Sequence, residues 1–338
     1  MSPLKYVGVL AFSLFLLGGC TRSGNERERS SGHAGILSQG ASSRKMVDVS
    51  LPILCRLDFA EIDPPLFRPT CIQADDAGSA YTLSWRNFLI YKFEFDKDGN
   101  FEKVSAFGKG RGQGPGELSQ PMDMKVRNGK IYISDLNTGS IEVYTTSGLY
   151  LKRLTYRDHD QEISPIRIVP IESGIVMQTY RFDKDKLFFV GDETGRAIRN
   201  FGNNYDNSMN SLVLLDGITS NACARGRFYF FPLYLGYVCV YNDRGLVFMK
   251  ETIDGVRYVN DGEPDVRVEE KAKTYWTASS AAIGASFMIV ATWERIDKTN
   301  RKSNWDIYRT SDFRYLFSIP NHPQVLEMAI CGNRLICL

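Results

Sequence analysis

The sequence predicts an all-β protein, a six-bladed β-propeller closed by N-terminal strands that complete the last blade. Aromatic residues make up 12% of the 338 residues, and together with many Val, Ile and Gly residues they favour strands and tight turns. An apolar or aromatic residue, a polar turn, a glycine and a new apolar run recur about every 49 residues. Each period contains four short strand-like runs, which is the make-up of a propeller blade.

The repeat is marked by glycines that end polar turns: Gly99, Gly148, Gly195 and Gly245. These glycines are 49, 47 and 50 residues apart, and an apolar run begins soon after each of them. A fifth copy, Tyr308–Tyr315, lacks the glycine. It comes later in the chain because an insertion around 254–276 precedes it.

The clearest period consists of four runs rich in Val, Ile and Tyr: Met122–Val126, Lys130–Asp135, Ser140–Thr145 and Tyr150–Thr155. Asn128-Gly129 lies between the first two runs and is a strong hairpin signal, because both residues tolerate the positive φ of a tight hairpin turn. Runs of this kind, bounded by Gly, Asn or Asp, predict antiparallel strands.

The number of blades follows from the length. Residues 46–338 hold about six periods of this size. The last run, Arg334–Leu338, is only the second strand of a blade. We expect Val47–Phe59 to supply the missing outer strands, which would cover two sheet edges that could otherwise pair with other chains.

Residues 1–19 have the features of a bacterial export signal. Lys5 provides positive charge, and the apolar run Tyr6–Leu17 is shorter than the ~20 residues that span a bilayer. That length is typical of a secretory signal peptide. Leu17-Gly18-Gly19-Cys20 resembles a lipobox, which implies cleavage before Cys20, a lipid thioether on Cys20 and N-acylation by a fatty acid such as palmitate. The alternative is an ordinary signal peptide with a chance cysteine.

The expected organisation is a signal peptide at 1–19, lipidated Cys20 with a disordered tether at 20–45, and the propeller at 46–338. Residues 21–45 are rich in Ser, Gly and charge and lack an apolar period, which predicts disorder. Two or three acyl chains anchor a protein stably. Thr21 rather than Asp follows the cysteine, which favours the outer membrane of the cell envelope, on its periplasmic or its surface side.

The net charge of +2 shows no basic excess, so the composition argues against binding of nucleic acid. With Cys20 lipidated, six cysteines remain: Cys55, Cys71, Cys223, Cys239, Cys331 and Cys337. None of them forms a Cys-x-x-Cys pair. Gly332-Asn333 is expected to form a hairpin turn that pairs Cys337 with Met328 rather than with Cys331. We therefore favour buried thiols over disulfides, although an exported protein can hold disulfides.

Phe107–Leu154 resembles an NHL-type repeat. The matching features are the Gly-x-Gly-Pro-Gly-Glu loop, Pro121 at the start of the next strand, Ile-Tyr-Ile-Ser ending at Asp135, and the Ile-x-Val-Tyr that begins at Ile141. With the lipobox, the whole chain resembles the TolB-like six-bladed propeller lipoproteins of Gram-negative bacteria. The resemblance is specific in this blade and degenerate elsewhere. It implies fold and location but little function, since most members lack an established activity.

Motifs for cofactors are weak. The glycines between Gly108 and Gly116 lack the register and the following helix of a phosphate loop, and we expect them to form a loop between blades. Asp96-x-Asp98-x-Asn100 begins like a calcium loop but lacks its later Gly and Glu, which favours a hairpin turn. The propeller sequence has two histidines, His159 and His322, so a three-histidine zinc site is excluded. No cofactor and no metal ligand is predicted; a divalent cation held by carboxylates from several blades stays an alternative.

One face of the expected propeller has the features of a binding surface. The turns on the opposite face are short, whereas the loops on this face are long, as binding loops often are. The long loops are Phe107–Pro121, Tyr156–Ser164, Asn200–Ser211 and Asp254–Trp276. Aromatic and arginine residues at strand ends of this face, and Arg111 on its first loop, suit sugar, peptide or anion binding. The candidates are Trp85, Arg86, Arg111, Tyr180, Arg181, Trp293 and Arg295. The alternative is that they pack against neighbouring blades.

These observations favour a binding or scaffold module over an enzyme, because His-Glu-x-x-His and Gly-x-Ser-x-Gly motifs are absent from the sequence. The expected partners are the membrane, through the lipid anchor, and an envelope protein, peptide or glycan. The alternative is a metal-dependent hydrolase or lyase with a carboxylate site in the central funnel. A purely structural spacer is a third reading of the same sequence.

Overall fold

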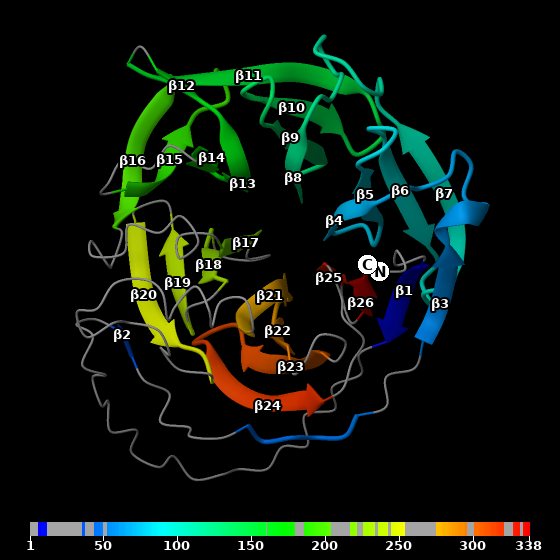
Figure 1. The fold of residues 1–338 in the computed structure, drawn as a ribbon, viewed down its shortest axis with the longest axis vertical. Helices are drawn as coiled ribbons and strands as arrows, with labels where there is room; N and C mark the ends of the chain where they lie inside the picture. Colours follow the sequence, from blue (N-terminus) through cyan, green and yellow to red (C-terminus); the bar gives the residue numbers. More distant parts are fainter. Residues whose placement is uncertain are drawn as a thin grey trace.

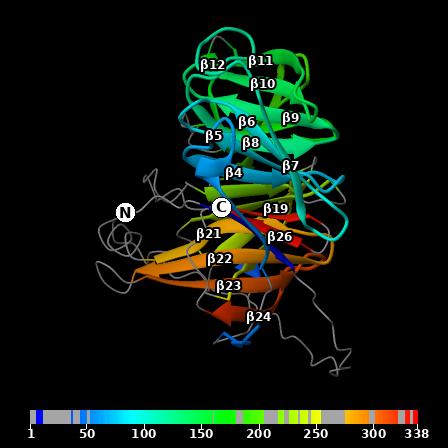
Figure 2. The same ribbon diagram turned by 90° about the vertical axis from the view of Figure 1, so that its right-hand side faces the viewer.

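In the computed structural model, six β-sheets surround a central axis (Figure 1). Figure 2 views the same ring from its side. The predicted all-β propeller fold is confirmed. The structure describes residues 6–11, 36–37, 44–49, 53–159, 161–179, 186–203, 217–221, 226–233, 236–242, 245–253, 275–295, 301–320, 327–331 and 334–338.

The first three blades follow one another along the chain, with the first strand of each nearest the axis (Figure 1). Blade one contains β4 (Pro69–Ala74), β5 (Ala80–Ser84), β6 (Ile90–Phe95) and β7 (Phe101–Phe107). Blade two contains β8 (Pro121–Arg127), β9 (Lys130–Asp135), β10 (Ser140–Thr145), β11 (Tyr150–Asp158) and β12 (Gln161–Ile163). Blade three contains β13 (Pro165–Ile171), β14 (Gly174–Thr179), β15 (Lys186–Gly191) and β16 (Ala197–Asn203).

Blades four and five continue the same pattern. Blade four contains β17 (Gly217–Asn221), β18 (Phe228–Pro232), β19 (Tyr237–Asn242) and β20 (Gly245–Glu251), with β2 (Ile36–Leu37) at its outer edge. Blade five contains β21 (Tyr275–Ile283), β22 (Phe287–Arg295), β23 (Arg301–Arg309) and β24 (Arg314–Pro320).

The sequence repeat corresponds to one recurring hairpin between the third and fourth strands. Gly99, Gly148 and Gly195 have φ values of +93°, +94° and +93°, which only glycine adopts without strain. The residue before each polar turn lies at a shift in strand register, and the same shift recurs in five blades. The aromatic-to-glycine pattern therefore encodes a bulged hairpin.

The copy in blade five keeps this hairpin without glycine. Phe313 takes the positive φ, at +55°, and is fully buried. Its ring stacks on Tyr308 with centroids 4.3 Å apart and an interplanar angle of 7°. Ring stacking and burial offset the cost of the left-handed backbone.

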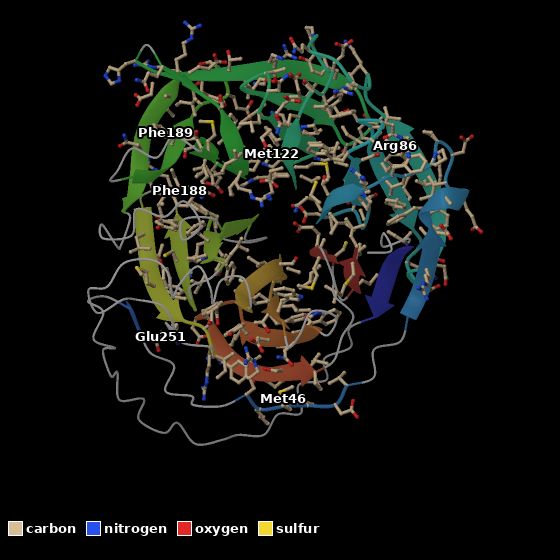
Figure 3. The ribbon with its side chains drawn as sticks, in the orientation of Figure 1. Met46, Arg86, Met122, Phe188, Phe189 and Glu251 are labelled. Atoms are coloured by element: carbon tan, nitrogen blue, oxygen red, sulfur yellow. The ribbon has the colours of Figure 1, made fainter. Side chains whose placement is uncertain are left out.

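Buried apolar side chains form six clusters in the described part of the chain, and each cluster joins two neighbouring blades. Phe188 and Phe189 are neighbours in β15 and point to opposite faces of blade three (Figure 3). Phe188 packs against blade four, with its ring centroid 5.5 Å from that of Phe228, whereas Phe189 packs against blade two. Continuous runs of buried residues along the inner strands follow from this two-sided packing.

The predicted loop at Tyr156–Ser164 is wrong, because this segment is mainly strand. β11 continues to Asp158 and pairs with β12, with Tyr156 opposite Ile163. Both side chains are buried in the cluster between blades two and three. Burying these two large side chains stabilises the extended pairing by about 1.5–3 kcal/mol each.

Blade six joins the two ends of the described chain, as predicted. Its order is β25 (Met328–Cys331), β26 (Arg334–Cys337), β1 (Tyr6–Ala11) and β3 (Ile53–Asp58). A 3-10 turn at Phe59–Glu61 leads on toward blade one. The predicted pairing of Met328 with Cys337 is confirmed. The outermost strand, β3, lies inside the segment Val47–Phe59 that we expected to close the ring.

The third strand of blade six comes from the expected signal peptide rather than from Val47–Phe59. β1 pairs antiparallel with both β26 and β3, and Gly8 lies opposite Cys337 on one side and Arg56 on the other. Two unpaired edges would otherwise face each other across the gap. A short run of apolar and β-branched residues satisfies the backbone groups of both. Cleavage before Cys20 stays a prediction, and it would remove this strand.

Two segments, Ile36–Leu37 within the expected tether and Arg44–Val47 at its end, contact the outer edges of blades four and five, and we call them together the strap. Ile36 pairs in parallel with Met249 of β20. Val47 N donates to Ser318 O of β24 at 2.8 Å, and Ser318 N donates to Lys45 O at 2.9 Å. The strap therefore covers the outer edges of blades four and five.

Arg44 attaches the strap to a buried carboxylate. Its Nε and Nη2 donate to the two oxygens of Asp306 at 3.0 and 3.1 Å. The Asp306 side chain is 1% exposed and also accepts from Ser318 Oγ. Cys20 and most of the expected tether lie outside the described residues. Lipidation and disorder there stay predictions.

Candidate ligand pocket between blades one and two

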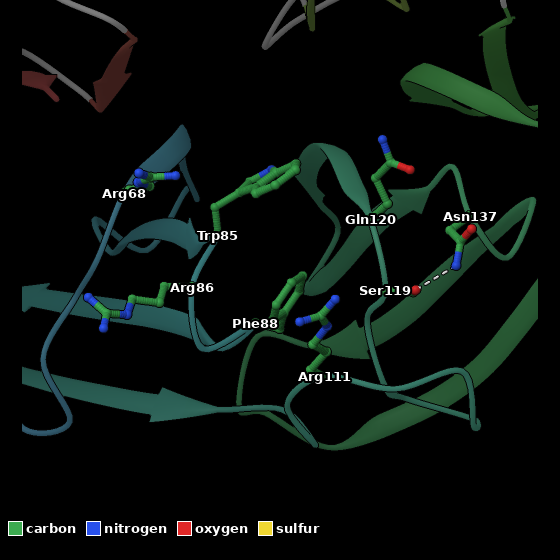
Figure 4. A pocket seen from close by; sticks show the side chains of 8 residues that line it. All are labelled: Arg68, Trp85, Arg86, Phe88, Arg111, Ser119, Gln120 and Asn137. Atoms are coloured by element: carbon green, nitrogen blue, oxygen red, sulfur yellow. Dashed lines mark hydrogen bonds between the residues drawn. The ribbon is translucent and has the colours of Figure 1, made fainter.

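A cavity of about 630 Å³ opens between blades one and two. Eight residues line it: Arg68, Trp85, Arg86, Phe88, Arg111, Ser119, Gln120 and Asn137. Figure 4 shows Arg68 beside Trp85 and the Arg111 guanidinium beside Phe88, whereas Arg86 points away from both rings. Three of the predicted ligand residues, Trp85, Arg86 and Arg111, thus lie at one site.

Trp85 is held in place by blade two although it belongs to blade one. It follows the last residue of β5, where Phe88 N donates to Ser84 O and turns the chain sharply. The indole Nε1 donates to Pro121 O at 3.1 Å. The side chain is nevertheless 38% exposed. A fixed aromatic surface with its polar group already satisfied is left facing the cavity.

Each arginine of the pocket lies beside an aromatic ring or a strand end. The guanidinium carbon of Arg86 lies 4.6 Å from the Phe67 ring centroid, and that of Arg111 lies 5.5 Å from the Phe88 ring centroid. Arg68 precedes β4 with a φ of +48°. Within the described residues, none of the three forms an ion pair with a carboxylate.

The polar wall is organised by Asp135 at the end of β9. Its carboxylate accepts backbone N–H groups of Ser119, Gln120 and Thr138, the last at 3.1 Å. Asn137 Nδ2 donates to Ser119 Oγ at 2.7 Å. These bonds hold the start of blade two against the turn after β9, so the amide side chains of this wall have a rigid support.

The glycine-rich segment is a loop between β7 and β8, as expected, and it carries Arg111. Buried Glu142 accepts Gly116 N at 3.1 Å and pairs with Arg153. Arg153 in turn donates to the carbonyls of Gln113 and Gly114 at 2.9 and 2.7 Å. The loop is thereby tied to blade two along most of its length.

The other predicted candidates do not join this pocket. Trp293 is 7% exposed on β22, which fits the alternative of packing between blades. Tyr180 and Arg181 lie outside the described residues, and so does the side chain of Arg295. Their role as ligand residues stays a prediction.

Sequence reasoning missed Arg68, Phe88, Ser119, Gln120 and Asn137. Arg68 had a usable signal, because the β4–β5 hairpin pairs Pro69 with Ser84 and so brings the residues before and after them together. The remaining residues come from a second blade or from a tight turn. Their proximity depends on how two sheets pack, which no local pattern reports.

The central funnel holds a separate charged group on the innermost strands. Asp123 accepts Lys125 Nζ at 2.8 Å and Ile168 N of blade three at 3.0 Å. Burial raises the pKa of Glu327 to about 7, opposed by the charges of Arg167 and Lys125. Among the described residues no group of three or more His, Cys, Asp or Glu side chains is arranged to hold a metal ion.

Four of the six cysteines that we expected to be thiols have described side chains, and these four form no disulfide. They are Cys71, Cys239, Cys331 and Cys337. Burial raises the pKa of the thiols of Cys71, Cys239 and Cys337 to about 12. These three positions fit buried structural cysteines. The side chains of Cys55 and Cys223 lie outside the described residues.

Comparison with known proteins adds information on the fold. No protein-family model matches the sequence, and no match is found among curated proteins. A structure described as an exported protein from Bacteroides fragilis matches with a TM-score of 0.51 and 14% identity, over 85% of this chain and 79% of its own. A DUF4221 member from Bacteroides vulgatus matches with a TM-score of 0.54 and 10% identity, over 80% and 92%.

In the part of the chain that the structure describes, no helix is long and apolar enough to cross a membrane. The structural likeness extends over most of each chain at low identity, so it bears on architecture alone. Together with the six sheets and six inter-blade clusters, it shows that this chain is a β-propeller.

Proposed function

We propose that this chain is an exported, lipid-anchored propeller that acts as a binding module of the bacterial cell envelope through the pocket between blades one and two. The observation that carries the proposal is three arginines lining one cavity without a carboxylate partner in the described structure. An unneutralised positive cavity of this size, beside an exposed indole, favours an anionic ligand.

The location rests on the sequence. An apolar run ending in Leu17-Gly18-Gly19-Cys20 has the order and length of a lipoprotein signal. Phe107–Leu154 resembles an NHL-type repeat, and with the lipobox the whole chain resembles the TolB-like propeller lipoproteins. The similar structure from B. fragilis is itself described as exported. These features support an extracytoplasmic binding module and an envelope protein, peptide or glycan as its ligand.

The test uses a photo-cross-linking amino acid at Arg86, at the edge of the pocket, in the lipidated protein expressed in its own envelope. Illumination should yield a discrete adduct with an envelope component. The matched control places the same amino acid at Lys103, an exposed position on β7 away from the pocket. Equal adducts from both positions, or none from Arg86, would contradict a ligand in this cavity.

A further inference from the structure

We infer that the pocket binds a sugar carrying a carboxylate, of the uronic acid class, as part of an envelope glycan. This inference rests on the proposed function and specifies its ligand. Four observations carry it: the charge of the lining, the exposed indole face, the amide wall and the rigidity of the supporting loop.

The positive charge of the lining residues favours an anionic ligand that carries a carboxylate group. The eight lining residues include three arginines and no acid. Asp135, which supports the polar wall, accepts backbone N–H groups of Ser119, Gln120 and Thr138. A guanidinium offers two parallel N–H donors that match the two oxygens of a carboxylate. Figure 4 places Arg68 beside the Trp85 indole and Arg111 beside the Phe88 ring; both line the cavity, and each can serve this role.

The exposed indole of Trp85 favours a ligand that has an apolar face next to its carboxylate. Trp85 Nε1 is already bonded to Pro121 O, so the indole presents carbon and π-surface rather than a donor. The axial C–H groups of a pyranose ring form such an apolar face. The cavity volume of about 630 Å³ also exceeds what a single inorganic anion needs and lies in the range of small-molecule sites.

The opposite wall calls for hydroxyl groups. Asn137 uses one N–H on Ser119 Oγ and keeps its carbonyl oxygen as an acceptor. The Gln120 side chain lines the cavity and makes no hydrogen bond to the described residues. Carboxamides combine donors and acceptors, and sugar hydroxyls do the same. The pocket therefore offers arginines for the carboxylate of the ligand, an indole for its apolar face, and carboxamides for its hydroxyl groups.

The supporting loop makes this arrangement preformed. Arg111 lies on the segment that buried Glu142 and Arg153 hold against blade two. The Trp85 indole bridges to the same blade. A site whose side chains need little ordering loses less entropy when a ligand binds.

The experiment measures binding of the lipidated full chain in detergent by isothermal titration calorimetry. The probes are the tetramers of galacturonate, glucuronate and mannuronate, and the methyl ester of each. We expect at least one acid to bind and its ester to bind about tenfold or more weakly, because the charge-assisted hydrogen bonds are lost. Arg68→Gln, Arg111→Gln and Trp85→Ala should each weaken binding of that acid by about tenfold or more, and Lys103→Gln should leave it unchanged.

Three outcomes overturn the inference. The first is an ester that binds as tightly as its acid. The second is tetraglutamate or inorganic phosphate that binds as tightly as the best uronate, which would make the ligand an anion but not a sugar. The third is no binding of any uronate. If the third occurs while position 86 still yields its specific cross-link, the proposed binding module stands and only the ligand class fails; if the cross-link is also absent, both fail.

Discussion

Glu327 shows how one partly buried carboxyl can set a property of the entire protein. It lies immediately before β25 on the axis side of blade six, where Asp123 and Lys125 of blade two and Arg167 of blade three act on it. Burial raises its pKa to about 7, because the charged form is poorly solvated there. An unfolded glutamate has a pKa of about 4.3, so folding takes up a proton between these two values.

The stability of the protein should therefore fall as the pH rises from about 4.5 to about 7, and change little from this source above pH 7. Glu327→Gln should remove this slope and raise the free energy of unfolding at pH 8 by about 1–3 kcal/mol. Urea unfolding between pH 4.5 and 8 measures both. Glu102→Gln, on exposed β7, is the matched control and should keep the slope. Carboxyls with lowered pKa, such as Asp312, act in the opposite direction and at lower pH. An unchanged slope in Glu327→Gln would show that another group titrates.

At the scale of elements, local patterns predicted the hairpins well. The Asn128-Gly129 turn has φ values of +49° and +70°, as its two-residue hairpin requires, and it joins β8 to β9 in the expected register. Glycine and asparagine determine such turns through their own backbone preferences. Neighbouring residues therefore suffice to predict these turns, and the spacing between successive turns gives the length of a blade.

Elements that depend on distant partners were not predicted in the same way. β1 lies in a run that resembles a signal peptide, and its pairing exists because β26 and β3 leave a gap. The strap lies in a polar segment whose contacts are mainly backbone bonds to β20 and β24. The candidate site shows the same division. Trp85 and Arg86 stood out by type and position, whereas Gln120 and Asn137 joined them only through the packing of two blades.

The strap should contribute measurably to stability through Arg44. Removing this guanidinium leaves the buried Asp306 carboxylate without its bidentate partner. We expect Arg44→Gln to lower the free energy of unfolding by about 1–3 kcal/mol. Lys45→Gln is the control, because the bonds of Lys45 to Ser318 and Tyr315 use its backbone. Equal urea midpoints for Arg44→Gln and the wild type would mean that the strap is not held by this pair.

At the scale of the whole molecule, the strap and the pocket lie on opposite sides of the ring. The strap runs over blades four and five, while the pocket opens between blades one and two (Figure 1). With a lipid on Cys20 and cleavage before it, the strap would be the first described part of the propeller after the anchor.

The lipid on Cys20 can be tested directly. Cys20→Ser should abolish incorporation of labelled palmitate, because it removes the sulfur that would carry the lipid. Labelled palmitate that persists on Cys20→Ser would contradict a lipid on Cys20.

The position of β1 also has a consequence for timing. Gly8 pairs with Cys337, so blade six cannot close until nearly the entire chain has been synthesised. If residues 1–19 act as an export signal, a chain that closed its ring first would have part of that signal paired between β26 and β3. Contacts between residues so far apart form slowly. Late closure would therefore keep residues 6–11 accessible while the chain is still being made, which is when an export signal in this segment would have to be recognised.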